Sequence, residues 1–169
     1  VGWRLRTGME FPLMGIAGAI RNDSLIFRLG ATIARHCKEL GVHINFAPVA
    51  DINNNAQNPV IGMRSFGENR NNVWHKTEMY IRGSLSENVL PVAKHFPGHG
   101  DTDTDSHYAL PLISQDRTRL DSLELYPFKK LIEAGLPAIM VAHLNVKALD
   151  SSGMPASLSA AVIDRYLKD

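Results

Sequence analysis

Short, nearly continuous apolar runs alternate along the chain with stretches in which apolar residues recur every three or four positions. The apolar runs cover residues 42–50, 89–96 and 138–144. Runs this short and this apolar predict strands that are buried on both faces. The periodic stretches cover residues 23–40, 72–87, 117–134 and 159–168, and their spacing predicts helices. This α-β-α-β-α-β-α order is typical of an α/β fold with a parallel sheet.

Local signals mark the ends of the first long helix. Asn22, Asp23 or Ser24 can accept a hydrogen bond from a free backbone N–H and so cap its start. Gly41 stands just after its end, where glycine is favoured, and leads directly into the first strand.

The loops and the length narrow the choice of architecture. The stretches after the strands are long and polar, at residues 51–71, 97–115 and 145–157, whereas those before the strands are tight. Doubly wound sheets and (β/α)8 barrels both place their chemistry there, and the long loops slightly favour the barrel. A barrel of this type needs about 250 residues. With 169 residues and three clear strands, we expect a partial TIM-type barrel of three to four βα units. Its open sheet edges imply that the rest of its own polypeptide completes it.

Composition excludes several classes of protein. The 18 Lys and Arg residues balance 17 Asp and Glu, so the net charge of +1 gives no electrostatic case for nucleic acid or an anionic membrane. No apolar run reaches the roughly 18 residues of a membrane span. The single Cys37 cannot form an internal disulfide and is expected in the core. The compartment, cytoplasmic or exported, stays open.

Residues 94–107, KHFPGHGDTDTDSH, are the part of the chain richest in chemistry. They hold three His, three Asp and one Lys in 14 positions, beginning at the end of a predicted strand. Titratable groups gathered in a loop on a rigid scaffold indicate a functional site.

Several kinds of site compete for this stretch. The three Asp residues resemble the start of an EF-hand calcium loop, but Ser106 and Leu112 stand where that loop needs Gly and Glu. The glycines at 98 and 100 lack the other residues of a phosphate-binding P-loop. A transition metal held by the three imidazoles with a carboxylate has suitable ligand types, but the spacing matches no helix-borne metal motif. Our interpretation therefore includes no metal and no other cofactor.

Acid–base catalysis fits the end of the stretch. Asp105 and His107 are two residues apart, which puts their side chains on one side of an extended backbone. The carboxylate can then fix the tautomer of the imidazole and leave its other nitrogen to transfer a proton. The alternative is that His107 bonds only the backbone of its own loop.

At this point the sequence resembles a known family. KHFPGHGDTDTDSH is similar to the signature loop of glycoside hydrolase family 3, in its exo-β-N-acetylglucosaminidase branch. NFAPVAD at 45–51, IGMRSFGE at 61–68 and MVAH at 140–143 resemble further segments of that family. The resemblance extends from Phe11 to Asp169, and it implies a (β/α)8-type catalytic domain of which residues 1–169 are a fragment.

The resemblance also implies roles for individual residues. His107 corresponds to the general acid/base and Asp105 to its partner. Lys94 and His95 correspond to a pair that hydrogen-bonds sugar hydroxyls, and Arg64 to a further substrate contact.

Two strand-end residues are weaker candidates for substrate binding. Asp51 ends the first predicted strand, with bracing of residues 53–58 as the alternative role. His143 ends the third predicted strand, where it can contact substrate or only line the pocket.

The implied function is a retaining exo-glycosidase that removes terminal β-linked N-acetylglucosamine from a carbohydrate, often a peptidoglycan fragment. Such an enzyme needs a carboxylate nucleophile. In the family this Asp follows a Gly-Phe-x-Gly strand, and no such segment is present in residues 1–169. We therefore expect this fragment to be inactive alone. The alternatives are a non-catalytic carbohydrate-binding remnant and a metal-dependent hydrolase.

Overall fold

The structure is a computed structural model that describes residues 9–103 and 110–168. Its helical segments, in chain order, are α1 (Met14–Gly18), α2 (Asp23–Glu39), η1 (Gly62–Arg64), α3 (Arg70–Ser86), α4 (Arg117–Ser122), α5 (Tyr126–Glu133), η2 (Ala156–Leu158), α6 (Ala160–Ile163) and η3 (Asp164–Lys168). Its strands are β1 (Ile44–Asn45), β2 (Leu90–Pro91), β3 (Ala93–Phe96), β4 (Leu112–Ile113), β5 (Ile139–Val141) and β6 (Asn145–Val146).

The strands pair in parallel, as the sequence predicts. β1 pairs with β2, β3 with β5 and β4 with β6, and an isolated parallel bridge joins Val49 to Lys94. The three predicted strand regions thus lie side by side in the order of the chain. The α/β class is confirmed, and the described residues form no closed barrel.

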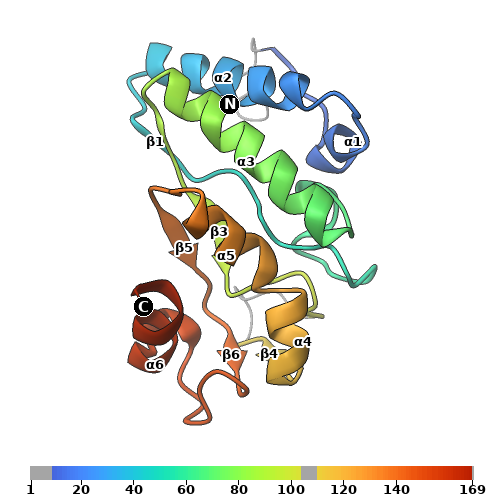
Figure 1. Ribbon diagram of the computed structural model, residues 1–169, viewed down its shortest axis with the longest axis vertical. Coiled ribbons are helices and arrows are strands. Elements are labelled where there is room, and N and C mark those ends of the chain that lie inside the picture. The colour runs from blue at the N-terminus through green and yellow to red at the C-terminus, as the bar shows by residue number, and fades with distance from the viewer. Residues whose placement is uncertain (1–8, 104–109, 169) are drawn as a thin grey trace.

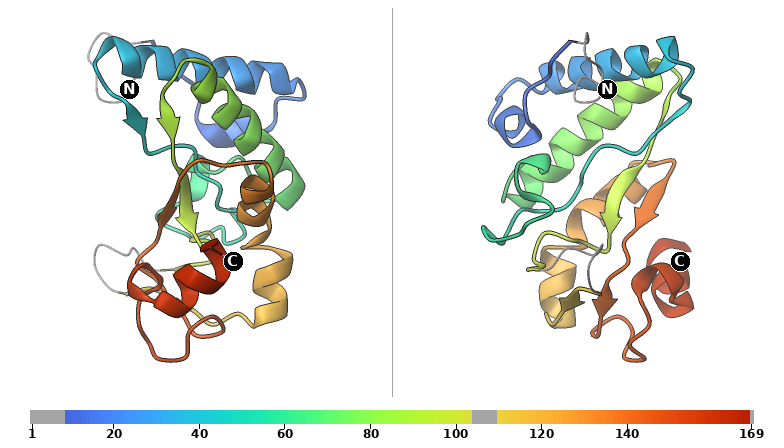
Figure 2. Two further views of the ribbon diagram at one scale, coloured as in Figure 1. Left: turned by 60° about the vertical axis from the view of Figure 1, so that its left-hand side comes forward. Right: turned by 180° about the vertical axis from the view of Figure 1, so that it is seen from behind.

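The long helices pack beside one another. α2 packs along α3, and α3 in turn contacts α5 (Figure 1). Both views of Figure 2 show the same succession, with α6 at the far end of the molecule from α2. None of the helices in the described ranges is long and apolar enough to cross a membrane.

The predicted ends of the first long helix are confirmed. The Asn22 side chain accepts a hydrogen bond from the Ser24 backbone N–H at 3.1 Å, and this caps α2. Gly41 follows the helix with a φ of +73°, which a residue with a Cβ rarely adopts.

Two predicted elements are each divided in the structure. The helix expected over 117–134 is interrupted between α4 and α5. Pro127 lies in the first turn of α5, where its missing N–H is tolerated, but it cannot donate into a continuous helix. The strand expected over 89–96 is divided at Val92, because β2 pairs with β1 whereas β3 pairs with β5.

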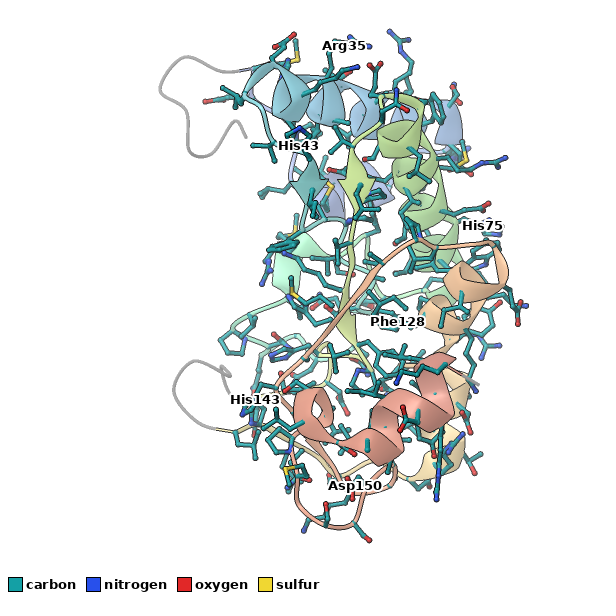
Figure 3. All side chains as sticks on the ribbon, turned by 90° about the vertical axis from the view of Figure 1, so that its left-hand side faces the viewer. Arg35, His43, His75, Phe128, His143 and Asp150 are labelled. Atoms are coloured by element: carbon teal, nitrogen blue, oxygen red, sulfur yellow. The ribbon has the colours of Figure 1, made fainter. Side chains whose placement is uncertain are left out.

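Among the residues that the structure describes, the core has one large cluster and two smaller ones. In the large cluster Phe96 of β3 meets Phe128 of α5 edge to face, with ring centroids 5.5 Å apart. Phe128 lies inside the molecule in Figure 3. Cys37 is buried beside Ala34 and Val89, which confirms its expected place in the core.

Candidate functional site

Asp51 connects the first two strand regions at their carboxyl ends. One of its oxygens, Oδ2, accepts a hydrogen bond from the His95 backbone N–H at 3.1 Å and lies 2.7 Å from His95 Nδ1. The other, Oδ1, accepts from the His99 backbone N–H at 2.7 Å. The single carboxylate of Asp51 therefore makes three contacts with the start of the stretch at 94–107, which we call the histidine-rich loop.

This contact also sets the chemistry of the His95 ring. An ionised carboxylate can only accept hydrogen bonds, so Nδ1 of His95 carries a proton. The tautomer of the neutral ring is then fixed, and Nε2 is its accepting nitrogen. Asp51 itself is completely buried, so it supports the loop from within the protein. Direct contact between Asp51 and substrate stays a prediction that this burial does not favour.

Asn58 holds the same loop from the neighbouring segment. Its side-chain N–H groups donate to the carbonyl oxygens of His99 at 2.8 Å and Gly100 at 3.1 Å. Its Oδ1 accepts from the backbone N–H groups of Val60 and Ile61. The two loops are thus joined by a buried amide whose donors and acceptor are all used, which favours one rigid arrangement.

His99 is buried at the centre of this arrangement. Its Nδ1 lies 2.6 Å from the hydroxyl oxygen of Thr102, and the O–H of that hydroxyl donates to the His99 carbonyl at 3.0 Å. The ring of His99 meets that of His95 edge to face, at 5.8 Å between centroids.

A pocket of about 260 Å³ opens over these rings. Its polar lining consists of Arg64, His95, His99 and His143, and its apolar wall comes from Val60 and residues 140–142. Concave sites with an apolar wall and a few convergent polar groups are typical of small-molecule binding. Aliphatic side chains and hydrogen-bonding groups together suit a ligand with both apolar faces and hydroxyls, as a sugar has.

His143 is placed at this pocket, as its strand-end position suggests. Its Nδ1 lies 2.8 Å from the Ser157 hydroxyl, and its ring is exposed. In Figure 3, His143 and His75 of α3 lie on opposite sides of the molecule.

Lys94 lines a different pocket from His95. That second pocket, of about 230 Å³, also contains Asn45, Tyr80 and Arg64. Arg64 borders both pockets, and its guanidinium donates to the Val60 carbonyl at 2.9 Å. The structure therefore brings together Arg64, His95 and His143, and it connects Lys94 to them through Arg64.

The surroundings of Lys94 disfavour its charged form. Burial lowers the pKa of the Lys94 ammonium, the positive charge of Arg64 lowers it further, and the carboxylate of Asp51 opposes both effects.

The expected acid/base pair, Asp105 and His107, lies outside the described residues. Within residues 9–103 and 110–168, no group of three or more His, Cys, Asp and Glu side chains is arranged to hold a metal ion.

Sequence reasoning did not select Asn58 or Glu124 as site residues. Asn58 lies in a loop rich in asparagine directly after a strand, and that composition was its only local signal. Glu124 lies at the interruption between α4 and α5, and nothing in its own segment marks it.

Comparison with known proteins agrees with this geometry. The family model for the glycosyl hydrolase family 3 N-terminal domain matches residues 1–169 of this sequence. The chain is 38% identical over 172 residues to beta-hexosaminidase A of Pseudoalteromonas piscicida, a match that covers 95% of this chain and 28% of that protein.

Solved structures give the same result. A glycoside hydrolase family 3 beta-N-acetylglucosaminidase from Paenibacillus sp. str. FPU-7 superposes with a TM-score of 0.90 at 42% identity, covering 95% of this chain and 31% of that one. NagZ from Neisseria gonorrhoeae, in complex with N-trifluoroacetyl-D-glucosamine, superposes with a TM-score of 0.88 at 27% identity, covering 97% and 50%. These neighbours imply a TIM-barrel-like domain, and this chain spans half or less of the length of each of these relatives. The chain belongs to glycosyl hydrolase family 3, and it matches the N-terminal domain of that family.

Proposed function

We propose that the polypeptide containing this chain is a retaining exo-glycosidase that hydrolyses terminal β-linked N-acetylglucosamine. The observation that carries the proposal is the Asp51 brace. It orients His95 and fixes the His99 backbone beside a pocket that also contains Arg64 and His143. Peptidoglycan fragments are the proposed source of such termini.

In the proposed mechanism the residues divide the work. Arg64, Lys94 and His95 hydrogen-bond the sugar, and His143 forms the pocket wall. His107, oriented by Asp105, protonates the glycosidic oxygen as the bond to C1 breaks. A carboxylate outside residues 1–169 attacks C1 and forms the glycosyl-enzyme. His107 then removes a proton from the water that releases the sugar, so the enzyme returns to its initial state.

The proposed architecture is a partial (β/α)8 barrel of three to four βα units, one fragment of a single catalytic domain. The strand regions at 42–50, 89–96 and 138–144 neighbour one another in parallel and in chain order, which supports this, because the sheet then advances in one direction, as in a barrel.

The test is hydrolysis of an aryl β-N-acetylglucosaminide by the full-length polypeptide. We expect turnover, and we expect His107→Ala to reduce kcat by about 10² to 10⁴. His75→Ala is the matched control, because His75 is an exposed histidine on the far side from His143. Residues 1–169 alone should not turn over.

Other outcomes would overturn the proposal. Sugar binding without turnover by the full-length polypeptide would indicate a carbohydrate-binding remnant. Loss of activity with a chelator would indicate a metal-dependent hydrolase. Robust, stoichiometric turnover by residues 1–169 would show that the nucleophile lies within them.

A further inference from the structure

Glu124 is a buried carboxylate between α4 and α5 that the proposed mechanism does not use. Its residue is 3% exposed. Its Oε1 accepts a hydrogen bond from the Asn54 side-chain N–H at 3.0 Å and lies 3.3 Å from Nη2 of Arg119. Asn54 belongs to the loop after the first strand region, 70 positions away in the chain.

The histidine-rich loop packs directly on this contact. Gly98 has a φ of +134°, and a Cβ at that position would lie 2.8 Å from Cβ of Glu124. A Cβ at Gly100 would lie 1.7 Å from the Ile52 carbonyl oxygen and 3.1 Å from Oδ1 of Asn54. The loop backbone thus approaches both Glu124 and Asn54 so closely that only glycine fits at these two positions.

A carboxylate is a costly residue for this place if packing is its only role. Within the described part of the chain, Oε2 of Glu124 is buried and has no hydrogen-bond partner. Burial raises the pKa of Glu124, and the charge of Arg119 opposes this. An apolar side chain of similar size would avoid the desolvation cost, so the acceptor oxygen Oε1, which faces both Asn54 and Arg119, is the feature to explain.

We propose that Glu124 is a positioning residue for the pocket. By holding Asn54, it fixes the loop at 97–101 against the loop at 52–58, and His95 and His99 thereby keep their places beside Arg64. Asp51 and Asn58 hold the histidine-rich loop by hydrogen bonds, and Glu124 packs against Gly98 of the same loop.

Hydrogen exchange in the full-length polypeptide tests this without any need for activity. Glu124→Ala should speed exchange of the backbone N–H groups of residues 98–102 by about 10- to 100-fold, because these groups open locally once the support is lost. Exchange in α2 should not change. Glu124→Gln keeps an acceptor oxygen for Asn54 and should change loop exchange by less than about tenfold.

Val89→Ala is the matched control for a general loss of stability. Val89 is buried in the separate small cluster with Ala34 and Cys37. Val89→Ala should lower the midpoint temperature of thermal unfolding and leave hydrogen exchange at residues 98–102 unchanged. If Glu124→Ala does not fold, Asn54→Ala removes the same hydrogen bond from the other side and carries the same expectation.

A kinetic measurement extends the test and rests on the proposed glycosidase function. Glu124→Ala should lower kcat/KM by about 10- to 100-fold, the effect of a small misplacement of site groups, and Val89→Ala should not. If the unmodified full-length polypeptide shows no turnover, the proposed glycosidase function is wrong. Hydrogen exchange would still decide the role of Glu124. Parent-like loop exchange in Glu124→Ala, or faster loop exchange in Val89→Ala, would overturn the positioning role.

Discussion

Among single residues, Lys94 shows how the fold changes the properties of a side chain. The sequence places a lysine at the end of a strand, but its neighbours decide how readily it holds a proton. Burial and the nearby guanidinium of Arg64 both lower the pKa of Lys94, while Asp51 raises it. The lysine therefore holds its proton less tightly than an exposed one, which suits its proposed role of hydrogen-bonding sugar hydroxyls.

Arg64→Gln should raise the pKa of Lys94 but leave it below the value of about 10.4 for a free lysine, because burial is the larger cause and remains. Between the lowered pKa and that free value, the unfolded chain binds more protons than the folded one. Lys94 should therefore make the free energy of unfolding increase as pH rises through this window. The increase should be smaller in Arg64→Gln. An NMR titration of the Lys94 side chain measures the pKa.

Lys130 of α5, whose pKa is raised by its hydrogen bond to Glu133, is the internal reference in the same titration and should not respond to Arg64→Gln. A fall in the pKa of Lys94 in this variant would contradict the electrostatic assignment.

Between elements, α2 and α3 pack with their backbones close together. A Cβ at Gly30 of α2 would lie 2.2 Å from the Tyr80 carbonyl oxygen, and one at Gly83 of α3 would lie 2.1 Å from that of Phe27. Two glycines thus allow the backbones to touch. Buried Lys76 of α3 adds a further link, donating to the Ile20 carbonyl and pairing with Asp23.

Gly83→Ala should reduce the free energy of unfolding by about 1 to 3 kcal/mol, because the added methyl group meets rigid backbone. Gly15→Ala is the matched control. There a Cβ would meet the flexible end of Met63, and the change should stay within about 1 kcal/mol. Urea unfolding of both variants measures the difference, and equal effects would show that helix contact is not the cause.

At the scale of the whole molecule, the sheet has an exposed apolar edge. Ile44 of β1 is 49% exposed and the nearby Phe46 is 59% exposed. Within the described residues, β1 pairs only with β2. Unpaired strand edges with apolar side chains favour association with another strand.

Residues 1–169 should therefore self-associate in isolation, and Phe46→Lys should raise the fraction of monomer, because a charge on an edge opposes pairing. Light scattering after size-exclusion chromatography gives the mass. Leu158→Lys changes an equally exposed apolar residue in η2, at 66% exposure, and should have little effect. If residues 1–169 without any substitution are monomeric, this expectation is wrong.

Local pattern was enough for the fold class, whereas the place of the site stays a prediction. The apolar runs, the helical spacing, the Asn22 cap and Gly41 each depend on a few neighbouring residues. They are confirmed, except that the strand expected over 89–96 and the helix expected over 117–134 are each divided. The histidine-rich stretch was selected for its density of titratable groups, and His95 and His99 do line a pocket.

Tertiary structure decided which side chains support that pocket. Asp51 contacts His95 and His99, which lie 44 and 48 positions further along the chain. Asn58 contacts His99 over a separation of 41 positions, and Glu124 contacts Asn54 over a separation of 70. No periodicity or spacing marks such pairs, because they form only when the whole fold brings together segments that are distant in the chain, such as the loops at the carboxyl ends of the parallel strands. The pattern of residues places the elements approximately and identifies the candidate chemistry that they carry, but the division of the strand at Val92 depends on which strands pair there. The packing of loop against loop determined which of those groups act together, since that packing depends on the whole sheet and not on any one segment.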